Sequence, residues 1–164
     1  MKNQLIQVFT ELNKRIEIEN KEREQTGTIR IPQTRIEILG QTSLLIQPEL
    51  TINLTLAQTG DLDAKLTADH FVKKNLKEIL PKYGFIYDED SYLIFIPENS
   101  YFSNFLNLTM IEIVVIDPES ALVSKALKAP EKNIQLIRQA IASGEYPNLV
   151  SRLLAAGGDL KRFI

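Results

Sequence analysis

Hydrophobic residues near the N-terminus recur every three to four positions, the spacing of one face of an α-helix. The members of this face are Leu5, Val8, Phe9, Leu12 and Ile16. The second half of the segment, EIENKEREQ, is almost wholly polar, and Thr26-Gly27 supplies a stop. The pattern therefore predicts an amphipathic helix over residues 1–25.

Alternation of apolar and polar residues, the period of a β-strand, follows this helix. Pro32 interrupts the first alternating stretch, so the predicted strand covers residues 34–39, and QTSLLIQ after Gly40 predicts a short helical turn. Residues 51–66 alternate again on both sides of a turn at residues 59–60. This pattern predicts that Asp61, Asp63 and Lys65 lie together on the polar face of one strand.

In the middle of the chain, the sequence pattern predicts a helix, a hairpin and a second strand pair. A helix capped by Thr67 runs to about residue 80 and turns Val72, Leu76, Ile79 and Leu80 inward. Residues 83–96 alternate like a hairpin with its turn in the acidic stretch 88–90. Another strand pair flanks residue 107 and ends in LTMIEIVVI, the strongest strand pattern of the chain.

Helix signals dominate the last third of the sequence. Asp117-Pro118-Glu119 combines an N-cap, a proline at the first helical position and an acid in the first turn. Two further helices follow Pro130 and Pro147. The order of elements predicts one α+β (α/β) domain over residues 1–164, with an N-terminal helix (1–25), a mixed sheet carrying one helix (34–116) and a helical tail (118–164).

Composition removes several classes of site. The chain has no cysteine and a single histidine, His70, which excludes disulfides, thiolate metal sites and zinc sites with several imidazoles. A net charge of -2 without a long basic run argues against bulk electrostatic binding of nucleic acid. No apolar run approaches a membrane span and the N-terminus lacks a signal-peptide pattern, so a cytoplasmic location is expected.

The pair Asp61-Leu62-Asp63 is the sharpest chemical feature. Two aspartates two positions apart on a strand lie about 6–7 Å apart between Cα atoms, close enough to share divalent cations such as Mg²⁺. A solvated acidic turn is the alternative interpretation. Upstream, Gly40 between a strand and a helix lets backbone amides approach a phosphate, and the hydroxyls of Thr42 and Ser43 add donors.

Three short motifs together resemble the polymerase-beta-like nucleotidyltransferase superfamily. They are Leu39-Gly40, Asp61-Leu62-Asp63 and, as the third acid between hydrophobic residues, Ile111-Glu112-Ile113. The resemblance implies a nucleotidyltransferase-like mixed sheet, nucleotide phosphates held at the glycine turn, and Mg²⁺ held by the three acids. The implied activity is transfer of a nucleotidyl group from a nucleoside triphosphate to an unidentified acceptor.

A second likeness lies in the segment DPESALVSKALKAPEKN. It is similar to the region after the sheet in small nucleotidyltransferase-like proteins of bacterial abortive-infection and toxin–antitoxin systems, and it implies a nucleotide-binding role for Lys125. Some positions depart from the family patterns, namely Gln41, Pro130 and Asn133. These departures leave a second hypothesis open, in which an inactive nucleotidyltransferase fold binds a protein partner as an antitoxin does.

Overall fold

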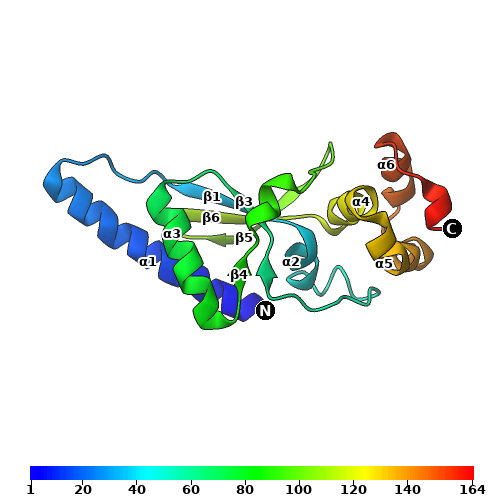
Figure 1. Ribbon diagram of the computed structural model, residues 1–164, viewed down its shortest axis with the longest axis horizontal. Coiled ribbons are helices and arrows are strands. Elements are labelled where there is room, and N and C mark those ends of the chain that lie inside the picture. The colour runs from blue at the N-terminus through cyan, green and yellow to red at the C-terminus, as the bar shows by residue number, and fades with distance from the viewer.

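A computed structural model describes residues 1–164 and arranges them as a mixed sheet between two groups of helices (Figure 1). The α-helices are α1 (Lys2–Thr26), α2 (Gly40–Leu45), α3 (His70–Ile79), α4 (Pro118–Lys128), α5 (Pro130–Ser143) and α6 (Leu149–Ala155). The strands are β1 (Thr34–Ile38), β2 (Asp61–Leu62), β3 (Ala64–Leu66), β4 (Ile86–Tyr87), β5 (Phe102–Asn107) and β6 (Ile111–Ile116). Short 3-10 helices are η1 (Leu80–Tyr83), η2 (Glu89–Leu93) and η3 (Leu160–Arg162).

The main sheet has four strands in the order β3-β1-β6-β5. Strand β1 pairs in parallel with β6 and antiparallel with β3, and β5 pairs antiparallel with β6. Strands β2 and β4 form a separate parallel pair. The predicted α+β class with a mixed sheet is therefore confirmed.

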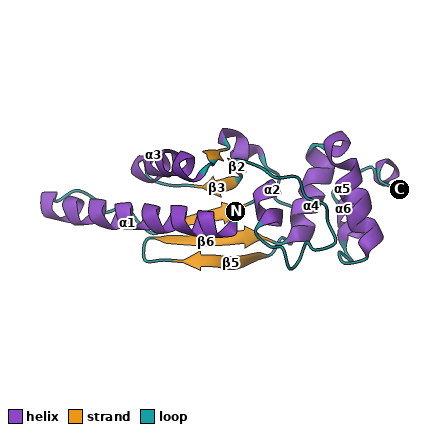
Figure 2. Cartoon of the chain, turned by 90° about the horizontal axis from the view of Figure 1, so that it is seen from below, coloured by secondary structure: helices purple, strands orange, loops and turns teal.

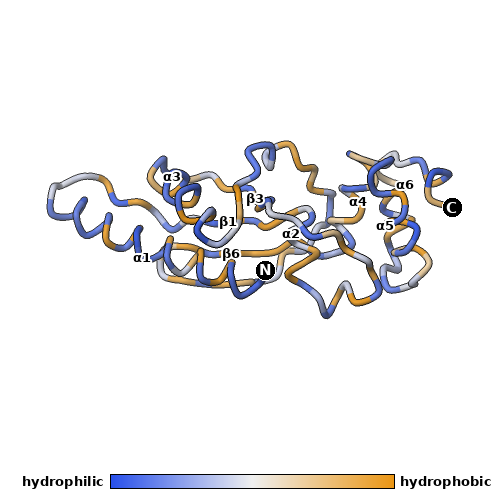
Figure 3. Tube along the Cα trace, turned by 60° about the horizontal axis from the view of Figure 1, so that its bottom comes forward, coloured by the Kyte–Doolittle hydropathy of each residue, from blue (hydrophilic) through white to orange (hydrophobic).

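Helix α1 packs with α3 on one face of the sheet, and its second half extends beyond it (Figures 1 and 2). All five residues of its predicted apolar face are fully buried, in one core with Ile36, Ile38 and Ile113 of the sheet. The projecting half is hydrophilic (Figure 3). Gly27 ends the helix in the left-handed conformation at φ 70°, as glycine at a helix C-terminus commonly does. No helix combines the length and the apolar character that a membrane span requires.

The tail helices α4, α5 and α6 form a second core with α2 at the other end of the sheet (Figure 2). The carboxylate of Asp117 accepts a hydrogen bond of 2.8 Å from the backbone N–H of Ser120, so the predicted cap of α4 is present. On α6, Leu149 and Leu153 are buried, while Leu154 is exposed.

Residues 51–56 alternate like a strand but form none, and Ile52 is 80% exposed. The neighbours of β1 are β3 and β6, and residues 51–56 join neither sheet. Side chains hold the loop instead, since Gln41 Nε2 donates to the carbonyl of Ala57 at 2.7 Å. The predicted single strand through the acidic pair is also wrong, because β2 and β3 end on either side of Asp63 and belong to different sheets.

The predicted hairpin over 83–96 is wrong as well. Residues 86–87 pair in parallel with β2, and the chain then turns into η2 because the Asp88 carboxylate accepts a 2.9 Å hydrogen bond from the N–H of Asp90. Helix α3 begins at His70 rather than after Thr67, since the carboxylate of Asp69 accepts a 2.8 Å bond from the N–H of Phe71. In both places a short aspartate–backbone bond decides the local structure.

Candidate functional site

A cavity of about 780 Å³ lies where β1, β2 and β4 end, between the sheet and the helices α4 and α5. Acidic side chains of the sheet region and basic side chains of the tail both line it. The acids are Asp61, Asp63, Asp88 and Asp90, and the bases are Lys125, Lys128 and Lys132. Gly40, part of the loop over residues 55–59 and uncharged polar residues of α4 and α5 also line it. The cavity therefore joins opposite charges from two parts of the chain that are separate in sequence.

The parallel pairing of β2 with β4 brings the third acid to the site. Leu62 is in register with Tyr87, so the next residues of the two strands, Asp63 and Asp88, follow side by side. The N–H of Asp88 donates to the carbonyl of Leu62 at 3.0 Å and fixes this arrangement. Asp88 is a site residue that the sequence analysis missed, because it assigned the acidic stretch 88–90 to a hairpin turn.

The carboxyl group of Asp63 lines the cavity and has a strongly shifted pKa. Its pKa is raised from 3.8 to about 6, first by burial and then by the hydrogen-bonded, like-charged carboxyl of Asp88. Hydrogen bonds from the backbone N–H groups of Thr42 and Gln41 act in the opposite direction, the latter at 2.9 Å from Oδ2. A proton or a cation shared between the two carboxyls relieves their repulsion, so the pair is suited to binding a cation.

Gly40 lies directly under this carboxylate. A Cβ atom at this position would stand 2.5 Å from Oδ2 of Asp63, and the backbone φ of +55° also favours glycine. The glycine predicted to admit a phosphate thus admits the carboxylate of Asp63. The carboxylate occupies the first free backbone amides of the short helix α2.

Thr42 and Ser43, the predicted phosphate-binding hydroxyls, are both fully buried. Thr42 Oγ1 donates to the carbonyl of Asp61 at 3.0 Å and accepts from the N–H of Asp63 at 3.1 Å. Ser43 Oγ donates to the carbonyl of Gly40 at 2.7 Å. Both hydroxyls brace the turn around the acidic pair, and neither lines the cavity.

Glu112, the predicted third acid, lies away from the cavity. It is at the start of β6, where its carboxylate accepts a 3.4 Å ion-paired bond from Arg35 of β1. In the parallel register β1 reaches the site only at Ile38, opposite Val115, three positions and about 10 Å further along the strand. Asp88, not Glu112, accompanies the acidic pair.

The three lysines face the acids from α4 and the start of α5. Burial lowers the pKa of Lys125, while the nearby charge of Asp63 raises it and that of Lys132 lowers it. Lys128 also lies 5.4 Å from the ring centre of Phe95, a cation–π distance. This basic side of the cavity is suited to an anion with several charges.

The donor set fits magnesium as a partner of a bound anion. Carboxylate oxygens are hard donors, and Mg²⁺ is usually held by one or two carboxylates together with substrate phosphates and water. No three acidic or histidine side chains form a complete ligand cluster. Asp63 and Asp88 would therefore supply the protein oxygens, with the rest coming from the anion and water.

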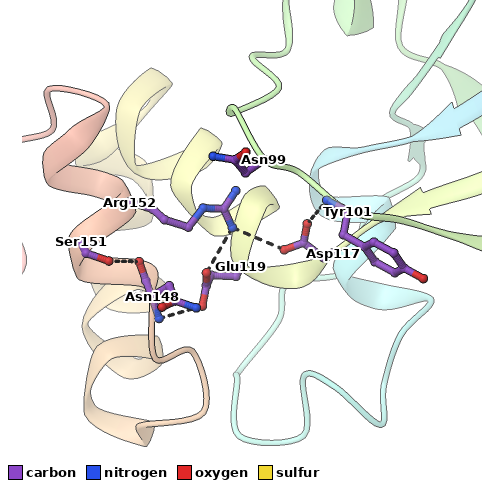
Figure 4. A pocket seen from close by; sticks show the side chains of 7 residues that line it. All are labelled: Asn99, Tyr101, Asp117, Glu119, Asn148, Ser151 and Arg152. Carbon is purple, nitrogen blue, oxygen red and sulfur yellow. Dashed lines mark hydrogen bonds and ion pairs between the residues drawn. The ribbon is translucent and has the colours of Figure 1, made fainter.

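A second, more open cavity of about 530 Å³ lies where α6 meets α4 (Figure 4). Arg152 is its central residue, and its guanidinium pairs with Glu119 at 3.1 Å and Asp117 at 3.7 Å. It also donates to Ser120 Oγ at 2.7 Å. These ion pairs and this hydrogen bond join α6 to the start of α4.

Substituting Arg152→Ala removes this junction. We expect the free energy of unfolding to fall by about 2 kcal/mol, because Glu119 and Ser120 lose a charge-assisted partner in a partly buried place. Arg162→Ala is the matched control, since Arg162 pairs with Glu131 at the surface and should contribute less than about 1 kcal/mol. Urea unfolding of both variants measures the difference, and equal losses would contradict the assignment.

No protein family model, no curated protein and no solved structure matches the chain.

Proposed function

We propose that this cavity binds a nucleoside triphosphate with Mg²⁺ and transfers its nucleotidyl group to an acceptor. One observation carries the proposal: the Asp63–Asp88 carboxyl pair and Asp61 line one side of a cavity, and three lysines line its other side. The first side suits a cation and the second suits a polyphosphate. Magnesium polyphosphate is the ligand that contains both.

Each group of side chains has a separate task in this proposal. Asp63 and Asp88 hold the cation, and Asp61 on the exposed rim extends the acidic surface toward the acceptor. Lys125, Lys128 and Lys132 neutralise the phosphate charge. Magnesium, when bound, supplies charge neutralisation at the phosphate that reacts. The oxygen of an acceptor hydroxyl forms a bond to the α-phosphorus, the bond from the α-phosphorus to the α,β-bridging oxygen breaks, pyrophosphate leaves, and the hydroxyl proton passes to water. Such transfers depend mostly on positioning and electrostatics.

The motif resemblance supports the same proposal with one change of residue. The glycine at the end of a strand and the following acidic pair both lie at the cavity, at Gly40 and Asp61-Leu62-Asp63. Asp88 takes the place that the resemblance assigned to Glu112.

A specific observation favours the second candidate, an inactive fold that binds a protein partner. The hydroxyls of Thr42 and Ser43 and the amide of Gln41 are all bonded within the chain, so the glycine turn offers a phosphate fewer donors than the family pattern implies. An antitoxin-like binding module needs none of these donors.

Calorimetric titration with ATP, GTP, CTP and UTP, with and without Mg²⁺, separates the two candidates. We expect Mg²⁺-dependent binding of at least one nucleotide, and we expect the double variant Asp63→Asn/Asp88→Asn to weaken it at least tenfold, because both cation ligands lose their charge. Glu112→Gln is the matched control, an acid of the same sheet outside the cavity, and should bind as the unmodified protein does. No binding at millimolar nucleotide favours the partner-binding module.

A further inference from the structure

The cavity has an apolar wall in addition to its two charged sides. We define the apolar wall as Ala57, Leu93, Ile94 and Leu136, which come from the loop before β2, from η2 and the residue after it, and from α5. Leu93 is 62% exposed although it belongs to the hydrophobic stretch YLIFI. The cavity is within the volume range of small-molecule sites, about 300–1,000 Å³.

In the segment that carries Leu93, a polar side chain is buried and a large apolar side chain is exposed. Ser91 is fully buried, whereas Leu93, two residues later, faces outward. A buried polar residue beside an exposed large apolar one is informative, because packing alone favours the opposite arrangement. Leu93 therefore has a position that the core does not explain.

Two hydrogen bonds hold this segment beside the acidic pair. Ser91 Oγ accepts a 3.1 Å bond from the N–H of Ala64, and Lys65 Nζ donates to the carbonyl of Ile94 at 2.6 Å. Ala64 and Lys65 directly follow Asp63 in the chain. Leu93 and Ile94 of the apolar wall are thus fixed relative to the carboxylate of Asp63, which is the requirement for a preorganised ligand contact.

From this arrangement we infer that the apolar wall packs against the base of the bound nucleotide. The inference rests on the proposed function and deepens it, because it assigns the place of the base and the residues that contact it, in addition to the phosphate site. The phosphates lie between the aspartates and the lysines, and the flat face of the base covers Leu93. Binding then buries an apolar side chain that is otherwise exposed to water.

The experiment compares Mg·ATP with Mg·tripolyphosphate, which has the same three phosphates and no base. Calorimetry gives both dissociation constants for the unmodified protein, for Leu93→Ser and for the matched control Leu154→Ser, an exposed leucine on α6 outside the cavity. We expect Leu93→Ser to weaken ATP binding about fivefold to tenfold, the effect of losing contact with part of one leucine side chain. Tripolyphosphate binding stays within about twofold in both variants.

A second variant, Leu93→Phe, enlarges the apolar surface. It should tighten ATP binding and leave tripolyphosphate unchanged. Equal weakening of both ligands by Leu93→Ser, or an ATP affinity that responds no more to Leu93→Ser than to Leu154→Ser, would overturn the inference. If the unmodified protein binds both ligands equally well with Mg²⁺, the charged site stands and the base contact fails. If it binds neither, the proposed function itself fails.

Discussion

Replacing Gly40 by alanine should destabilise the protein by about 3 kcal/mol. The backbone φ of +55° costs an L-residue about 1–2 kcal/mol, and the added Cβ would stand 2.5 Å from Oδ2 and 2.9 Å from Cγ of Asp63. The carboxylate cannot move away without losing its bond to the N–H of Gln41. Urea unfolding of the variant measures the loss.

Gly144→Ala is the matched control for this experiment. Gly144 has a φ of +71°, close to that of Gly40, but nothing lies within 4 Å of its added Cβ. It should lose only the conformational part, about 1–2 kcal/mol. In the double variant Gly40→Ala/Asp63→Ala the clash is absent, so the effects of the two single substitutions on stability should not add. Equal losses for Gly40→Ala and Gly144→Ala, or additive effects in the double variant, would contradict the contact with Asp63.

Replacing Asp63 by asparagine should stabilise the fold at pH 7.5 while it removes cation binding. The pKa of Asp63 is raised from 3.8 to about 6, so the folded state binds this proton more tightly than the unfolded state does. Its contribution to stability is complete below about pH 3.8 and is lost as the pH rises through 6. Asparagine carries no charge to bury, so the variant should gain about 2 kcal/mol at pH 7.5.

The pH dependence supplies the check. Between pH 4 and 7 the free energy of unfolding of the unmodified protein should fall relative to that of Asp63→Asn, which lacks the titrating carboxyl. Asp88→Asn removes the neighbouring carboxyl and should reduce this slope, whereas Asp90→Asn, which lines the same cavity but does not shift the pKa of Asp63, should leave it unchanged. A loss of stability in Asp63→Asn at pH 7.5 would show that the bonds to the α2 amides outweigh the cost of the buried charge.

The same linkage predicts how cation binding depends on pH. A cation competes with the proton for the Asp63–Asp88 pair, so Mg²⁺-dependent nucleotide binding should weaken as the pH falls below about 6. Stability and ligand binding thus have opposite pH dependences at one residue. Such a conflict is typical of functional sites, where a destabilising group is retained for its chemistry.

The sequence determined the elements whose signals are local. The spacing of apolar residues predicted α1, and all five of its predicted core residues are buried. Asp117-Pro118 fixed the start of α4 because the capping bond and the proline lie within four residues of each other. The apolar, β-branched run IEIVVI predicted β6, and all of its residues except Glu112 are buried. Gly40 and the acidic pair were likewise recognisable from their spacing.

Only the tertiary structure decided which residues meet. Residues 51–56 have the alternation of a strand, but they pair with no strand of either sheet and form a loop. Asp88 joins Asp63 through the register of β2 with β4, a contact between strands about 25 residues apart that no local pattern encodes. Glu112 stands in an equally regular strand pattern, yet its register places it beside Arg35 at the other end of β1. Local spacing fixes the direction in which a side chain points, whereas strand pairing fixes its neighbours, and the site depends on the neighbours.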